Sequence, residues 1–154
     1  IEFENILSDH DCAPHHMESI AEHIQMCILN VYVRHSHKDY GKDMTRIAMF
    51  HDLGKSITKT MVDKNGVEKA TYRGHAGVSA NYMLNYFFNK NGGIISPKEM
   101  DLVEVVYQHM NAHQGITQKN INKNKLNDNV LKMLEDFRII DSISRVKGDE
   151  TVGV

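Results

Sequence analysis

The sequence has little of what is typical of a secreted, membrane-bound or multidomain protein. Its two cysteines, Cys12 and Cys27, are too few for a disulfide framework, and Cys27 falls at a predicted core position, which predicts a reduced, cytoplasmic protein. No apolar run approaches the ~20 residues that a membrane-spanning helix needs, so we expect no membrane partner. The opening Ile-Glu-Phe-Glu-Asn does not have the pattern of a signal peptide. With only two prolines and no low-complexity tract, the chain shows no linker and no second domain.

The sequence also has no large excess of positive or negative charge. The 18 Lys and Arg against 20 Asp and Glu give a net charge of -2, which provides no argument for a basic surface that binds duplex nucleic acid. A chain of 154 residues, 41% hydrophobic and 25% charged, is typical of one folded domain, and we expect a single domain over 1–154. The chain does not begin with Met, which is compatible with a domain cut from a longer polypeptide.

Apolar residues recur at helical spacing through most of the chain. In the first predicted helix, for example, Ile20, Ile24 and Cys27 repeat every three or four residues. The polar stretch 111–127 is predicted to be largely loop, with room for one helical turn. The predicted helices cover 18–33, 43–53, 75–88, a segment that begins at 97, and 129–147.

Local signals set the predicted boundaries of these elements. Gly54 is predicted to end the second helix, and Asp128 to cap the last one. Ser96, Pro97 and Glu99 form the pattern of a capping box at the start of the fourth helix.

One segment has strand character instead. Between 57 and 72 the chain is predicted to form a hairpin with Asn65-Gly66 as its turn. The predicted fold is therefore an all-α bundle of five or more helices with a small β-hairpin insertion near 57–72.

Histidine is abundant, with 10 among 154 residues. Several imidazoles and carboxylates fall on predicted inward faces; His23, for example, lies three residues after Ile20 and four before Cys27. A single inward histidine is more often a hydrogen-bonded core residue than a metal ligand, but a buried carboxylate such as Asp141 needs a cation or several donors. Six such residues in a short chain are best explained by a shared metal centre. They are His23, His51, Asp52, His75, His109 and Asp141.

The types of ligand limit the choice of metal. Mixed histidine and aspartate ligands without thiolates suit a divalent transition metal, Mn, Fe, Co, Ni or Zn, with Mg as an alternative. The number of ligands allows one ion or two.

The same residues resemble the HD-domain metal-dependent phosphohydrolases. The resemblance lies in His23 of AEHIQMC, His51-Asp52 of FHDLGK and Asp141 of RIIDSISR. His75 in YRGHAGVSA and His109 in VYQHMNAH match the additional histidines of members that bind two metals. The segment from FHDLGKSITKT through a hairpin to YRGHAGVSANYML is similar to the HD domain of bacterial tRNA nucleotidyltransferases and of related phage and bacterial proteins linked to nucleic-acid end repair. The nucleotidyltransferase head is absent, so its polymerising activity is not implied.

The resemblance implies an HD-domain bundle with a hydrolytic metal centre. His23, His51, Asp52 and Asp141 would hold the first ion, with Asp52 bridging to a second ion at His75 and His109. An activated water would attack the phosphorus of a phosphomonoester or phosphodiester in a nucleotide or a nucleic-acid end, such as a 2′,3′-cyclic phosphate.

Three cations are candidates for binding the phosphate of the substrate. Lys55 follows His51 by one turn, and Arg145 follows Asp141 by four residues, so both are candidate catalytic and substrate-binding residues. Arg73, just before Gly74-His75, is a candidate substrate-binding residue. Each of the three also has an interpretation as a solvated surface charge.

Two other functions stay open at this point. A minority of HD proteins are mixed-valent di-iron oxygenases, and a degenerate HD domain would only bind a nucleotide or a partner. The remaining histidines also have alternatives: His113 is a reserve ligand, four residues after His109. His10, His15 and His16 are predicted either to line the cleft mouth or to lie on the surface, and His35 and His37 are predicted in an exposed loop.

Overall fold

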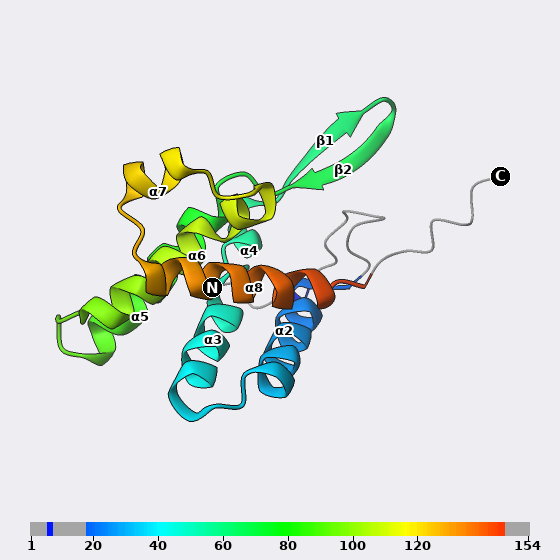
Figure 1. Ribbon diagram of the computed structural model, residues 1–154. Coiled ribbons are helices and arrows are strands. Elements are labelled where there is room, and N and C mark those ends of the chain that lie inside the picture. The colour runs from blue at the N-terminus through cyan, green and yellow to red at the C-terminus, as the bar shows by residue number, and fades with distance from the viewer. Residues whose placement is uncertain (1–5, 8–17, 147–154) are drawn as a thin grey trace.

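The described part of the chain is helical apart from one two-stranded hairpin, as predicted (Figure 1). In this computed structural model the described residues are 6–7 and 18–146, so Cys12, His10, His15, His16 and the predicted end of the last helix at 147 lie outside them. The elements are α2 (Ile20–Arg34), α3 (Lys38–Phe50), α4 (Lys55–Thr58), β1 (Thr60–Lys64), β2 (Val67–Thr71), α5 (His75–Lys90), α6 (Pro97–Gln114), α7 (Gln118–Asn124) and α8 (Asp128–Ile143).

Side-chain caps begin several of these helices. The predicted capping box at α6 is present, with Ser96 accepting from the backbone N–H of Glu99, and α2 has a second one at Ser19. The predicted cap of α8 is wrong by one residue. Asn127, not Asp128, has the extended backbone of a cap, and its side chain accepts from the backbone N–H of Val130.

The second predicted helix differs from the structure at both ends. Helix α3 begins at Lys38 and ends at Phe50, and the chain then turns through 51–54 into the short α4. Gly54 does not end α3 but caps α4, because here the chain passes closely against α5. A Cβ at Gly54 would lie 2.2 Å from the carbonyl oxygen of His75, and the Gly54 N–H donates to Ser79 Oγ at 2.8 Å.

The prediction that 111–127 is largely loop is also wrong. Helix α6 continues to Gln114, and α7 adds seven further helical residues. Thr117 caps α7 by accepting from the backbone N–H of Asn120. This cap is hard to recognise in the sequence because the whole segment is polar.

The hairpin has the predicted turn. β1 pairs antiparallel with β2, with Lys64 opposite Val67, and Asn65 and Gly66 between them both have positive φ, as a tight two-residue turn requires. Figure 1 shows the hairpin extending away from the helices, so only its base lies near them.

The helices bury one continuous apolar core. α6 packs against α5, α8 and α3, and α3 also packs against α2, α5 and α8. The core includes Val31, Met44, Ile47, Met83, Phe87, Val106, Leu134, Phe137 and Ile140. Five helices therefore bring one face each to a common centre. In the described ranges, no helix has both the length and the apolar character to cross a membrane.

Candidate metal centre

All six predicted ligands lie together at this common centre. None is more than 5% exposed. His23 comes from α2, His51 and Asp52 from the turn after α3, His75 from the first residue of α5, and His109 and Asp141 from α6 and α8. Residues up to 118 positions apart in the sequence thus meet in one buried cluster, which could hold a metal.

The first group of donor atoms lies on the α2 and α8 side. The ligand atoms of His23, Cys27, His51 and Asp141 all lie within 4.8 Å of one another. His23 Nε2 is 3.1 Å from Asp141 Oδ1 and 3.6 Å from Cys27 Sγ. Cys27 was expected to be a core residue, and a thiol among the ligands was not predicted. The signal that could have found it is its position four residues after His23 on the same helix face.

The second group lies on the α5 and α6 side and consists of Asp52, His75 and His109. His75 Nε2 is 3.2 Å from His109 Nε2. Asp52 Oδ1 is 3.3 Å from His75 Nε2 and 3.8 Å from His109 Nε2.

Asp52 lies between the two groups. Its Oδ2 atom faces the first group, 3.4 Å from His51 Nε2 and 3.8 Å from His23 Nε2, while its Oδ1 atom faces the second. One carboxylate with an oxygen toward each group has the placement that a bridging ligand needs.

The orientation of the imidazoles fits metal binding. In His51, His75 and His109, Nδ1 donates to the backbone carbonyl three residues earlier, at 2.9, 2.7 and 2.7 Å respectively. A carbonyl oxygen can only accept, so this assignment gives Nδ1 the hydrogen and leaves the Nε2 lone pair directed into the cluster. Metal-ligating histidines are held in the same way, by a hydrogen bond from the ring nitrogen that does not touch the metal.

In two contacts of the cluster, two acceptor atoms face each other, and a positive charge between those atoms would stabilise each contact. Nε2 of His51 is buried and makes no hydrogen bond within the described residues, and the atom of Asp52 that it faces is also an acceptor. Nε2 of His75 and of His109 likewise face each other. A divalent cation in each group would satisfy these lone pairs, so the residues present fit a metal centre of one or two ions.

The pKa values of Asp52, Asp141 and His109 are all shifted toward the deprotonated form that binds a metal. Burial raises the pKa of Asp52, but Lys55 and His51 outweigh it and hold that pKa well below 3.8; His113 and His23 do the same for Asp141. Burial lowers the pKa of His109 to about 3.

His23 is the exception among the ligands. Burial acts to lower its pKa, but hydrogen bonds to Asp141, Cys27 and Glu18 raise it to about 12. In the metal-free chain this imidazole is therefore protonated on both ring nitrogens at neutral pH, and a metal ion has to displace the proton on Nε2.

A cavity of about 380 Å³ opens onto the cluster. Asp52, His75, His109 and Asp141 line it on one side, and the end of β2 with Tyr72 forms part of its wall. The three predicted substrate-binding cations also line it: Lys55, Arg73 and Arg145.

These cations are placed differently. Lys55 is buried and its Nζ is 2.8 Å from Asp52 Oδ2, whereas Arg73 is exposed at the rim. Arg145 is 3.4 Å from Asp141 Oδ2. The structure therefore brings all three to the same cavity, with Lys55 deepest.

His113 has a different place from the one expected. It does not join His75 and His109 as a reserve ligand; its Nε2 is 2.5 Å from Asp141 Oδ2 and 3.3 Å from an Arg145 nitrogen. His113 lies one further turn along α6 and contacts Oδ2 of Asp141, whereas His23 contacts Oδ1.

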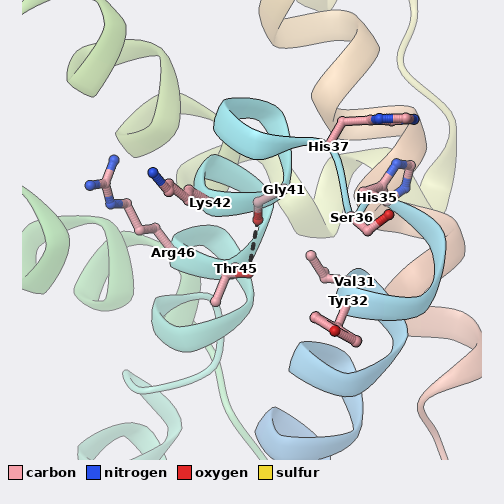
Figure 2. A pocket seen from close by; sticks show the side chains of 9 residues that line it. All are labelled: Val31, Tyr32, His35, Ser36, His37, Gly41, Lys42, Thr45 and Arg46. Atoms are coloured by element: carbon pink, nitrogen blue, oxygen red, sulfur yellow. Dashed lines mark hydrogen bonds between the residues drawn. The ribbon is translucent and has the colours of Figure 1, made fainter.

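Another cavity, of about 370 Å³, lies at the corner between α2 and α3 (Figure 2). His35 and His37 stand at the connection between the two helices, and Lys42 and Arg46 project from α3. Its lining contains none of the six predicted ligands, so this cavity is separate from the metal centre.

Comparison with known proteins identifies no relative of this chain. No protein-family model, no curated protein and no solved structure matches the chain. The structure itself establishes a helical protein with a small hairpin and a buried histidine and aspartate cluster that could bind metal.

Proposed function

We propose that the protein is a metal-dependent phosphohydrolase of the HD type. Its substrate would be a phosphomonoester or phosphodiester in a nucleotide or a nucleic-acid end, such as a 2′,3′-cyclic phosphate. The observation that carries the proposal is the position of Asp52, between two histidine-rich groups and at the wall of a cavity with three cations. The order of the ligands in the sequence, which resembles that of HD phosphohydrolases, supports it.

The ligands divide between two ions. His23, His51, Asp52 and Asp141 would hold the first, and His75 and His109 the second, with Asp52 shared. When bound, one or two divalent ions supply Lewis-acid stabilisation of the phosphoryl charge and lower the pKa of a water molecule toward neutrality. Mn, Fe, Co, Ni and Zn suit these donors best, with Mg as the harder alternative.

The protein's own residues have three tasks in this proposal. The carbonyl-bonded imidazoles keep their Nε2 atoms directed at the centre without rearrangement. Lys55 keeps the Asp52 carboxylate ionised and, from the cavity wall, is within reach of a phosphoryl oxygen. Arg145 and Arg73 add positive charge on the same cavity, where guanidinium groups bind phosphate in a bidentate manner.

The test is hydrolysis by protein of defined metal content. The purified chain is stripped with a chelator, reloaded with one metal at a time, and assayed with p-nitrophenyl phosphate, bis-p-nitrophenyl phosphate, 2′,3′-cyclic nucleotides, and 3′- and 5′-phosphorylated oligonucleotides. We expect chelator-sensitive hydrolysis of at least one nucleotide or oligonucleotide substrate, and its loss in Asp52→Asn.

Two outcomes would replace the proposal with an alternative. Oxygen consumption by the iron-loaded protein, without phosphate release from any substrate, would favour the di-iron oxygenase. Nucleotide binding without turnover under every metal would favour a non-catalytic binding domain.

A further inference from the structure

Cys27 has no role in the proposed function although it belongs to the buried cluster. It lies one turn after His23 on α2 and is 0% exposed. Its Sγ is 3.6 Å from His23 Nε2 and within 4.8 Å of a donor atom of both His51 and Asp141. A sulfur atom therefore faces the same small space as three other donor atoms.

The separations match those of ligands around one ion. Ligands at about 2.0–2.1 Å for nitrogen or oxygen and about 2.3 Å for sulfur, arranged tetrahedrally, lie about 3.3–3.6 Å apart. His23 Nε2 lies 3.6 Å from Cys27 Sγ and 3.1 Å from Asp141 Oδ1. Small adjustments of side chains would bring all four donors to a common ion.

A second, independent observation points to a cation in this space. Nε2 of His51 points into the same group, is fully buried, and makes no hydrogen bond within the part of the chain that the structure describes. Its Nδ1 already donates to Ala48, so the free lone pair is on Nε2. The ion that would satisfy this lone pair lies in the group of donor atoms to which Cys27 Sγ also belongs.

We propose that Cys27 is an additional ligand of the first metal ion, beside His23, His51, Asp141 and the shared Asp52. The inference rests on the metal centre of the proposed function. On binding, the S–H bond breaks, the proton goes to the buffer, and the sulfur lone pair forms the bond to the ion, with no change of oxidation state. A thiolate ligand makes this site selective for thiophilic divalent ions such as Zn²⁺, Co²⁺ or Fe²⁺ over Mg²⁺.

The experiment is the absorption spectrum of the cobalt-loaded protein. Metal-free wild type is titrated with Co²⁺ beside Cys27→Ser, Cys27→Ala and the control Cys12→Ser, which changes the other cysteine of the sequence. We expect a thiolate-to-cobalt charge-transfer band in the near ultraviolet for wild type and Cys12→Ser. Both Cys27 variants should lose this band and keep the visible d–d bands of bound cobalt.

The outcomes separate the two proposals. Cobalt bound with d–d bands, but with no charge-transfer band in wild type or an unchanged band in Cys27→Ser, would overturn the role of Cys27 and leave the metal centre standing. No bound cobalt in wild type would overturn the metal centre itself. If neither Cys27 variant folds, X-ray absorption of the wild-type cobalt protein decides: a sulfur neighbour at about 2.3 Å supports the ligand, and only nitrogen and oxygen neighbours overturn it.

Discussion

Replacing Asp52 by Asn tests how the cluster is held together, because it removes one charge and almost no volume. Asp52 Oδ2 is 2.8 Å from Lys55 Nζ, and the two side chains are 4% and 10% exposed. The substitution leaves a buried ammonium without its carboxylate. Breaking a buried pair from one side costs about 3–5 kcal/mol, and we expect about 3 kcal/mol because Lys55 lines the cavity and can reach water.

This loss of stability is measurable on the metal-free protein by thermal denaturation. For a chain of 154 residues, about 3 kcal/mol corresponds to a decrease in Tm of about 6–12 °C. Asp39→Asn is the matched control, because Asp39 and Lys42 are also three residues apart but are 84% and 71% exposed. An exposed pair contributes about 0–1 kcal/mol, so the control should change Tm by no more than about 2–4 °C.

The same variant tests the bridging role in the metal-loaded protein. Loss of the shared ligand should reduce the bound metal to at most one ion per chain. Loss of several kcal/mol of metal-derived charge stabilisation should lower the rate of hydrolysis by about 10³-fold or more. Equal Tm values for Asp52→Asn and Asp39→Asn, or wild-type metal content and turnover in Asp52→Asn, would refute the reasoning.

Three further predictions concern four of the candidate ligands and the glycine that packs against His75. His75→Ala and His109→Ala should each lower the metal content toward one ion per chain by elemental analysis, while wild-type content in both would make the centre mononuclear. The pKa values of Asp52 and Asp141 are held below 3.8 in the folded protein, so the stability that these carboxylates contribute is present above about pH 4 and is lost as the pH falls further. Thermal denaturation of the metal-free protein from pH 7 to pH 3 measures this loss, and a constant Tm would contradict the prediction. Gly54→Ala should lower both Tm and metal content, since its Cβ would lie 2.2 Å from the His75 carbonyl oxygen and displace that ligand; unchanged values would show that this close approach is not needed.

The burial of the candidate ligands could be predicted from the sequence because helical periodicity is enough to place a polar residue on an apolar face. His23 and Asp141 were found in this way, and both are buried where expected. What periodicity cannot provide is the direction of a side chain within that face. Cys27 fits an apolar stripe as well as any aliphatic residue, and its proximity to His51 and Asp141 appears only when α2, α3 and α8 are packed together.

The errors in the predicted helix boundaries also have physical causes. Helix α3 extends back to Lys38 through Gly41, a residue that weakens a helix prediction. A Cβ at Gly41 would lie 2.1 Å from the carbonyl oxygen of His35, so the glycine is there for the close corner between α2 and α3. Helix α7 is mostly polar. Within it only Ile121 packs against the core, joined by Ile116 just before the helix, and two such contacts are too few for a periodicity to be recognised.

The central claim, a metal centre on both sides of Asp52, is tested most directly by anomalous diffraction from crystals of the cobalt- or zinc-loaded protein. The account predicts anomalous peaks at bonding distance from His51 Nε2 on one side of Asp52 and from His75 Nε2 on the other, about 3.5–4 Å apart if both ions are bound. A peak at the first position alone would refute the second ion and reduce the centre to a single-ion site. Saturated crystals with no peak at either group, or with metal only at surface histidines, would contradict it.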